Sequence, residues 1–336
     1  MSFRVRPARS GDFDAFYDMA MLTGGGFTNL PQDKGALAAK LARSEQAFTS
    51  EEGDPLGDLF VFVLENVDTG AIRGTCQVFS RVGLRQPFYS YRVSTLTQVS
   101  PELGKTFRAG MLSLCTDFEG SSEVGGLFLH PESRAGGLGV LLARSRYLFI
   151  KRNRRRFADT VLAELRGVLD DDGGSPFWDA IAGRFFGMNF QEADTFNGAH
   201  GTRFIADLMP KTPIYTAMLS EAALAVMAKP HPTGRAAMRM LEEEGFEGGD
   251  YVDIFDGGPT MSADTDEVET IRNASEHVLS GLAEEGESRL VAAGRLQDFA
   301  ACYGKVGARD GAATLDAKAA QMLGLEPGDD FHAIAR

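Results

Sequence analysis

The stretch that decides the fold reads EVGGLFLH at residues 123–130, RAGGLG at 134–139 and VLLARSRYLFI at 140–150. The first segment is an apolar run of strand length, and the last has the spacing and length of a helix. A glycine-rich turn from a strand into a helix leaves unpaired backbone N–H groups at the helix start. These donors, with the helix dipole, favour a pyrophosphate. An ordinary tight turn without a ligand is the alternative.

Three residues of this turn match a phosphate-binding pattern. Gly137 and Gly139 let the backbone approach an anion closely, because no Cβ intervenes. The turn is neither the Gly-x-Gly-x-x-Gly of dinucleotide folds nor a nucleotide triphosphate loop, which ends in Lys-Ser/Thr. Together with Arg134 the glycines form Arg-x-x-Gly-x-Gly after a strand. This arrangement resembles the acyl-CoA pyrophosphate loop of the GNAT N-acyltransferases, which implies that Arg134, Gly137 and Gly139 bind the co-substrate.

The composition predicts a globular protein without nucleic-acid or membrane partners. The chain has 336 residues and a formal charge of −13, from 34 basic and 47 acidic side chains, which argues against binding to polyanions in general. Three scattered cysteines suggest neither a disulfide framework nor a metal site. The N-terminus, MSFRVRPARSGDFD, has no apolar signal core, and no apolar stretch reaches about 18 residues, so we expect a cytoplasmic protein.

The order of elements predicts a mixed α/β layered domain. Strands are expected at 3–6, 59–65, 71–80, 89–99, 112–115, 123–130 and 160–168. Helices are expected at 10–20, 34–48, 140–150 and 175–186. Asp68-Thr-Gly70 predicts a hairpin, and the glycine-rich loop 23–31 is either a connector or a turn that contacts a ligand. This order is similar to that of the GNAT fold, including a terminal helix that closes on a glycine.

A second, degenerate half is expected downstream. The helix expected at 236–244 ends at Gly245-Phe246 before a strand at 251–255, as the helix at 175–186 ends at Gly187. No second Arg-x-x-Gly-x-Gly occurs, so only one cofactor site is expected.

The last part of the chain is expected to be a small β-rich appendage. The acidic stretch 262–287 keeps helical spacing at Val268, Ile271, Val278 and Leu279, and short strands are expected at 290–293 and 331–334 beside a helix at 315–323. We therefore expect a GNAT-like domain at 1–200, a degenerate second half at 201–262 and a β-rich C-terminal subdomain at 263–336.

Seven longer segments, in order, resemble those of the arginine N-succinyltransferases. They are TGGGFTNLP (23–31), YSYRVSTL (89–96), SSEVGGLFLHPESR (121–134), SPFWDAIAGRFFGMNF (175–190), LMPKTPIY (208–215), HPTGRAAMRMLEEEGF (231–246) and YVDIFDGGPT (251–260). The resemblance covers residues 1–262 almost without a gap, and the tail follows more loosely. It implies transfer of a succinyl group from succinyl-CoA to the α-amine of L-arginine, with succinyl-CoA as co-substrate and no permanently bound cofactor.

The resemblance also implies roles for two residues, Leu127 and His231, and a third candidate comes from GNAT enzymes in general. Leu127 lies where the cofactor is bound, and we infer that its main-chain N–H faces the thioester oxygen; the alternative is an ordinary core leucine. His231 is implied as the proton donor, a role that imidazole suits at neutral pH. Glu123 stands on the strand where many GNAT enzymes carry their general base, although the residue alone could equally be a solvated strand end.

Four further candidates follow from the charges of the substrates. A succinyl carboxylate favours an arginine fork, for which Arg92 and Arg166 lie in strand motifs. A guanidinium favours carboxylates, and Asp253 and Asp256 are candidates. Each could instead be a surface residue. The basic run at 151–156 is either a solvated helix end or a contact for the CoA 3′-phosphate.

Two alternatives to the arginine enzyme stay open. One is a GNAT relative that acylates ornithine or another amine. The other is a non-catalytic subunit of a paired-chain enzyme, since some relatives work as paired chains. We accordingly expect a homo-oligomer or a pairing with a homologous sister chain.

Overall fold

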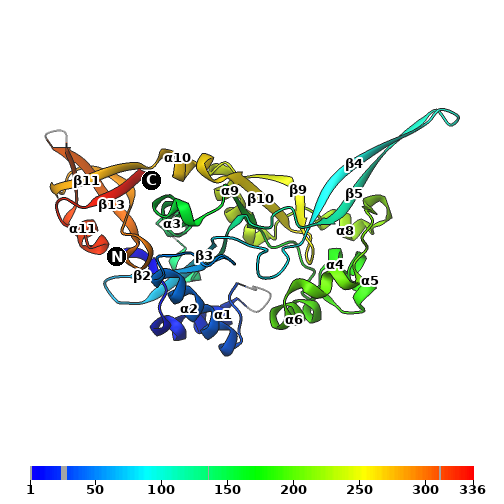
Figure 1. Cartoon of the computed structure of the whole chain (residues 1–336), viewed down its shortest axis with the longest axis horizontal. Helices are drawn as coiled ribbons and strands as arrows, with labels where there is room; N and C mark the ends of the chain where they lie inside the picture. The colour runs from blue at the N-terminus through cyan, green and yellow to red at the C-terminus, as the bar shows by residue number, and fades with distance from the viewer. Residues whose placement is uncertain (1, 24–28, 135, 310–311) are drawn as a thin grey trace. The chain divides into compact units, whose positions relative to one another are not determined.

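The computed structural model describes residues 2–23, 29–134, 136–309 and 312–336. The loop expected at 23–31 therefore falls mostly outside the described residues. The chain forms two compact units (Figure 1). Unit 1 comprises Met1–Ser80, Ser122–Asp159 and Asp264–Arg336, and unit 2 comprises Arg81–Ser121 and Thr160–Ala263. These units do not follow the boundaries 1–200, 201–262 and 263–336, because residues 81–121 belong with the later segment.

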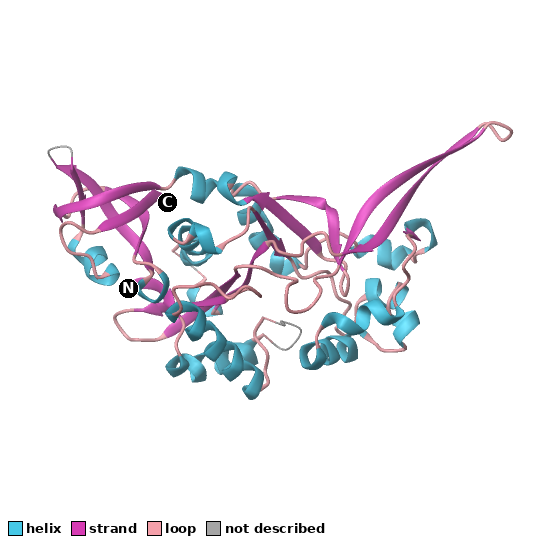
Figure 2. Ribbon diagram, in the orientation of Figure 1, coloured by secondary structure: helices cyan, strands magenta, loops and turns pink. Residues whose placement is uncertain are grey.

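Unit 1 contains an antiparallel sheet with the strand order β1–β2–β3–β6 (Figures 1 and 2). The strands are β1 (Phe3–Pro7), β2 (Leu59–Asn66), β3 (Ile72–Phe79) and β6 (Ser122–Leu129). The helices beside them are α1 (Phe13–Leu22), α2 (Lys34–Thr49), α3 (Leu138–Arg152) and α10 (Glu269–Asn273). The expected hairpin is confirmed, since β2 and β3 pair on either side of Gly70, whose φ is +73°.

Strand β2 is apolar from Leu59 to Leu64, where both its faces are buried. On one face Val61 and Val63 pack in a cluster with residues of α1 and α2. On the other face Phe60 and Phe62 contact Phe149 of α3, with ring centroids 4.9 Å apart in each pair. The sheet is therefore held between helices, and β6 leads directly toward α3.

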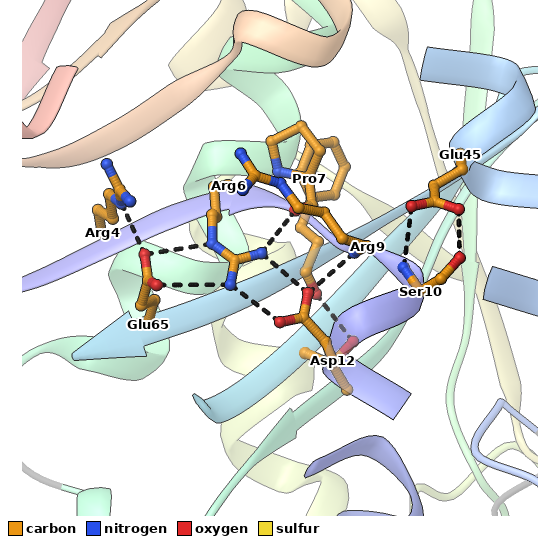
Figure 3. A network of polar contacts seen from close by, with 10 residues as sticks. Arg4, Arg6, Pro7, Arg9, Ser10, Asp12, Glu45 and Glu65 are labelled. Carbon is orange, nitrogen blue, oxygen red and sulfur yellow. Dashed lines mark hydrogen bonds and ion pairs between the residues drawn. The ribbon is translucent and has the colours of Figure 1, made fainter. Parts of the chain in front are cut away.

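A polar network joins β1 to β2 and to the start of α1 (Figure 3). The Arg6 guanidinium donates to both carboxylate oxygens of Asp12 at 2.9 Å and to Glu65 at 3.2 Å. Arg4 donates to the same Glu65 carboxylate at 2.7 Å. Arg6 is buried, so this two-pronged pairing compensates for its lost hydration.

Residues 275–335 close into a five-stranded barrel in the order β12–β15–β11–β14–β13, with β13 pairing back to β12. The strands are β11 (Ser275–Leu282), β12 (Glu287–Ala293), β13 (Ala300–Arg309), β14 (Ala312–Leu315) and β15 (Asp330–Ala335). Helix α11 (Ala317–Leu323) shares its apolar core, and β13 also pairs with β1. The helical spacing expected through Val278 and Leu279 is wrong, because both residues lie on β11.

Unit 2 has the strand order β7–β10–β9–β4–β5–β8. The strands are β4 (Ser90–Ser100), β5 (Lys105–Cys115), β7 (Thr160–Glu164), β8 (Ile214–Tyr215), β9 (Glu247–Asp253) and β10 (Pro259–Asp264). The helices are α4 (Pro176–Ala180), α5 (Gly183–Phe186), α6 (Phe190–His200), α7 (Ile205–Leu208), α8 (Glu221–Val226) and α9 (Arg235–Glu243). Strand β5 is longer than the expected 112–115, because it pairs with β4 along its whole length.

The core of unit 2 is centred on Trp178, which is fully buried. Its ring stacks on Phe255, with centroids 5.4 Å apart, and its Nε1 donates to the carbonyl of Met188 at 2.8 Å. Ser175 caps the helix as expected, but the expected helix 175–186 is broken at Ile181 into α4 and α5. Helix α6 was not expected from the sequence.

The basic run at 151–156 is engaged within unit 1. Arg152 pairs with Asp330 at 2.6 Å, Arg154 with Asp266 at 2.7 Å, and Arg156 with Asp58 at 2.8 Å. A solvated helix end is therefore the wrong interpretation of these three side chains, since they join α3 to other segments of the unit.

Among the described helices, none combines the length and apolar composition needed to cross a bilayer.

Candidate functional site

The glycine-rich turn begins α3, as the sequence predicts. Gly137 is the N-cap residue and has a φ of +79°, and Gly136 has a φ of +66°, conformations that favour glycine. A Cβ at Gly139 would meet only Leu129 Cδ2, at 3.9 Å. Packing therefore does not require glycine at 139. Arg134 is exposed, and its Nε donates to the carbonyl of Leu129 at 3.4 Å.

Two side chains from the end of the chain contact this turn. The Tyr303 hydroxyl donates to the carbonyl of Gly137 at 2.9 Å, and Arg336 Nη2 donates to the carbonyl of Gly136 at 2.6 Å. The Arg336 guanidinium also lies over the Tyr303 ring, 4.3 Å from its centroid. Tyr303 of the barrel and Arg336, which follows β15, thus hold the turn through its two carbonyls. Sequence reasoning missed both residues, since neither lies in a recognisable motif.

Strand β6 carries a bulge just before the turn. Gln77 of β3 pairs with Gly125 of β6, and Thr75 of β3 pairs with Phe128 of β6. Two residues of β3 therefore span the same length as three residues of β6. The extra residue falls at Gly126–Leu127, and Gly126 has a φ of +61°. A bulge leaves its extra residue out of the ladder, so it can present a main-chain N–H to a ligand. This is the position at which the sequence suggested a backbone role for Leu127.

Glu123 lies on β6, two residues before Gly125, and faces a cation. Burial raises the pKa of Glu123, and the charge of Lys40 on α2 opposes that rise. Burial likewise lowers the pKa of Lys40, against the charge of Glu123. The Lys40 ammonium donates to the carbonyl of Asn29 and to the side-chain oxygen of Gln77. A carboxyl whose pKa is raised toward neutrality suits a general base.

Sequence reasoning missed Lys40, although a signal was present. In the amphipathic helix 34–49 the buried positions include Leu37, Leu41 and Ser44. Lys40 falls in the same stripe, three residues after Leu37 and four before Ser44. A lysine in the apolar stripe of a helix is unusual unless it is paired or functional.

In unit 2 the structure brings together Arg166 and His231. The backbone N–H of His231 donates to the carbonyl of Arg166 at 2.7 Å. The Nδ1 of His231 accepts the backbone N–H of Thr233 at 3.3 Å and lies 2.7 Å from the Thr233 hydroxyl. The proton of the neutral imidazole therefore sits on Nε2. Burial and the charge of Arg166 lower the pKa of His231, so this neutral form predominates at pH 7.

Asp253 and Asp256 lie close to Arg166 but are occupied by the backbone. Asp256 accepts the N–H of Gly167 at 2.7 Å through one oxygen and that of Gly258 at 2.8 Å through the other. Asp253 Oδ1 accepts the N–H groups of Phe255 and Asp256 at 2.7 and 2.8 Å. Burial raises the pKa of both carboxyls, and in Asp253 the charge of Asp256 adds to the rise. The visible role of Asp256 is to hold the loop after β9.

Asp194 of α6 is a carboxylate that sequence reasoning missed. Burial and the charge of Asp253 raise its pKa, and the charge of Arg166 opposes that rise. Asp194 therefore lies within electrostatic range of two predicted site residues, Asp253 and Arg166.

Arg92 is not brought to Arg166, His231 or Asp253 by any contact among the described residues. Its side chain is 55% exposed and pairs with Asp117 at 3.3 Å. Tyr251 donates to the same Asp117 oxygen at 3.0 Å.

The substitution Asp253→Asn is expected to stabilise the protein by about 1 kcal/mol at pH 8 and by less at pH 5. Asparagine keeps the oxygen that accepts the two N–H groups and removes the charge. A carboxyl with a raised folded pKa destabilises the folded state once pH rises above its ordinary pKa. Urea unfolding at both pH values measures the effect, with Asp250→Asn, an exposed position on β9, as control. An equal gain at both pH values would contradict the assignment.

Comparison with known proteins adds the deciding observation. Residues 3–270 match the family described as arginine N-succinyltransferase beta subunit, and residues 277–335 match the C-terminal domain of that subunit. The chain belongs to the arginine N-succinyltransferase family. The matched ranges include every site residue predicted from the sequence.

Individual proteins similar to this chain belong to the same family. The chain is 44% identical over 275 residues to the arginine N-succinyltransferase of Citrobacter koseri, covering 80% of this chain and 78% of the relative. It is 45% identical over 271 residues to that of Salmonella paratyphi B, with the same coverage. The solved structure of arginine/ornithine succinyltransferase subunit AI from Pseudomonas aeruginosa superposes with a TM-score of 0.90 at 32% identity, covering 99% of this chain and 98% of that one.

Proposed function

We propose that this protein transfers the succinyl group of succinyl-CoA to the α-amine of L-arginine. The structural observation that carries the proposal is the sequence of features along one segment of unit 1. Glu123, the bulge at Gly126–Leu127 and the glycine turn at 136–139 follow one another from β6 into α3. A base, a backbone donor and an anion-binding helix start are what acyl transfer from a CoA thioester to an amine requires.

In unit 1 each of these features has a chemical task. Arg134 and the N–H groups at Gly137 and Gly139 bind the pyrophosphate of CoA. The Leu127 N–H stabilises the oxygen of the thioester carbonyl as it gains negative charge, which backbone donors do without reorganising. Glu123 removes a proton from the attacking ammonium group, directly or through water. Succinyl-CoA is a co-substrate, and no bound cofactor is needed for this chemistry.

In unit 2 the proposed tasks concern the leaving group and the acceptor. His231 offers its Nε2–H as the donor to the leaving group. Arg166 binds a substrate carboxylate, and Asp194 with Asp253 binds a guanidinium. Asp256 positions the loop that carries Asp253, and Arg92 stays a weaker candidate because it already pairs with Asp117.

The proposal extends to architecture and assembly. Unit 1 carries the GNAT-like elements that hold the acyl-CoA, and residues 201–262 are a degenerate second GNAT-like half, followed by the barrel as an appendage. The matched family is described as a beta subunit, and the Pseudomonas aeruginosa relative is named a subunit. These descriptions support a homo-oligomer or a pairing with a homologous sister chain.

Thiol release by the purified protein tests the function. Succinyl-CoA with L-arginine is expected to release free CoA, and acetyl-CoA or omission of the amine is expected to give little. L-Ornithine serves as the second acceptor, because the Pseudomonas aeruginosa relative is named for both amino acids. Release with ornithine and not arginine would favour the alternative acceptor. No release with any pair, despite CoA binding, would contradict a stand-alone enzyme and favour a required sister chain.

The substitution Tyr303→Phe is expected to weaken CoA binding about three- to tenfold, with little change in melting temperature. The hydroxyl donates to the Gly137 carbonyl, so its loss frees the turn that presents the N–H groups to the pyrophosphate. Calorimetric titration with CoA measures the effect, and Tyr215→Phe on β8 is the control. Unchanged CoA affinity would show that the barrel does not support the turn.

A further inference from the structure

A pocket in unit 1 has no task in the mechanism above. It has a volume of about 360 Å³, within the range of small-molecule sites. Its polar lining is Asn29, Lys40, Arg43 and Gln77, and its apolar lining includes Leu59 and Phe79. Two cations and two amides in an otherwise apolar pocket suit a short aliphatic chain that ends in a carboxylate.

Two residues that line the pocket, Asn29 and Gln77, also lie beside Gly125 of β6. A Cβ built on Gly125 would lie 3.3 Å from Glu123 Oε1, 3.7 Å from Asn29 Nδ2 and 3.9 Å from Gln77 Nε2. The amides that line the pocket therefore surround the residue next to the bulge. An acyl group whose carbonyl lies at the bulge can extend its free end toward these amides.

Lys40 is placed to bind a carboxylate directly. An ammonium group has three N–H donors. Two of them are taken by the carbonyl of Asn29 and the side-chain oxygen of Gln77, and Gln77 is itself held by its Nε2 bond to Asn29 Oδ1 at 2.6 Å. Glu123 acts on Lys40 through charge, without a hydrogen bond between them in the described part of the chain. Among the residues that the structure describes, one donor therefore remains for a ligand.

The charge balance favours an anion over a cation. Burial weakens the charges of Lys40 and Glu123 together, because it lowers the pKa of the first and raises the pKa of the second, so the charge of Arg43 leaves the cluster net positive. Arg43 lines the pocket and contributes its charge there. Its Nη2 donates to the carbonyl of Gly57 at 3.1 Å, and its guanidinium lies 5.7 Å from the Phe79 ring centroid. A guanidinium or ammonium ligand would meet net repulsion here.

We infer that Lys40, held by Asn29 and Gln77, forms the subsite for the free carboxylate of the donor's succinyl group. This inference rests on the proposed function. It replaces Arg92 and Arg166 as the succinyl-binding residues and makes Lys40 the residue that selects succinyl-CoA over uncharged acyl-CoA donors.

The test compares two acyl-CoA ligands of the same chain length. Succinyl-CoA and butyryl-CoA both carry four acyl carbons, and only the first carries a carboxylate. Calorimetric titration gives the ratio of their dissociation constants. In Lys40→Met the preference for succinyl-CoA is expected to fall about ten- to a hundredfold, with the affinity for CoA unchanged. Lys34→Met, on the exposed face of the same helix, is the matched control, and Lys40→Arg is expected to keep part of the preference.

Each outcome decides the subsite. A preference unchanged in Lys40→Met, or an equal loss with both ligands, would overturn it. If Lys40→Met fails to melt cooperatively, Lys40→Gln carries the same comparison with a smaller change in polarity. The subsite and the proposed function fail separately. If the wild-type protein transfers succinyl groups and the ratio of dissociation constants is unchanged in Lys40→Met, the subsite alone is refuted. If the ratio falls in Lys40→Met and the wild-type protein transfers no succinyl group, the function alone is refuted.

Discussion

The substitution Glu123→Gln is expected to lower kcat for arginine succinylation about 10²- to 10⁴-fold, the range for losing a general base. Glutamine has the size of glutamate and cannot accept the proton that the attacking amine must lose. The dissociation constant of succinyl-CoA should change little, because Glu123 lies before the bulge and the glycine turn. Steady-state thiol release and calorimetric binding measure the two quantities.

The pH dependence gives the sharper form of this prediction. Burial raises the pKa of Glu123 above the ordinary carboxyl range, and a base acts only when deprotonated. The wild-type rate should therefore rise with pH through that raised pKa, and the Glu123→Gln rate should be flat there. Removing the Lys40 charge should move the rising part of the pH–rate profile to higher pH with every acyl donor. Its effect on affinity, by contrast, should differ between succinyl-CoA and butyryl-CoA. Glu132→Gln, at an exposed position near the turn, is the control. A Glu123→Gln enzyme whose rate still rises with pH as in the wild type would exclude Glu123 as the base.

Local chemistry made the first part of unit 1 predictable. The apolar run of β2, the turn at Asp68–Gly70 and the glycine start of α3 each follow from residues adjacent in sequence. The C-terminal barrel was less predictable, because β13 has the sequence AACYGKVGAR, with small residues that carry weak strand signals. Its closure depends on pairing of β12 with β13 and β15, which is not a local property.

The candidate site divides in the same way. Glu123 and Leu127 were accessible to sequence reasoning because they stand in one strand beside the glycine turn. Lys40 and Tyr303 reach that segment from distant parts of the chain, so only the fold reveals them. Asp256 shows the converse: its charge suggested a substrate contact, whereas both its oxygens accept backbone N–H groups.

The substitution His231→Ala is expected to lower kcat about 10²- to 10³-fold, the loss found when one donor to a developing charge is removed. His231 is neutral at pH 7 because burial and Arg166 lower its pKa, and its Nδ1 is already an acceptor for Thr233. The group that it offers is therefore the Nε2–H. Its contribution should not decline between pH 7 and 8.5, since the neutral form is retained as pH rises.

The comparison with His231→Gln separates hydrogen bonding from full proton transfer. A glutamine amide can accept the Thr233 N–H through its oxygen and still offer an N–H, but it cannot release a proton. If His231 acts by hydrogen bonding to the leaving sulfur, His231→Gln should retain clearly more activity than His231→Ala. Equal loss in both variants would contradict a role by hydrogen bonding. His277→Gln, on β11, should leave kcat unchanged, and because His277 lies outside unit 2, its loss tests for effects of histidine removal in general.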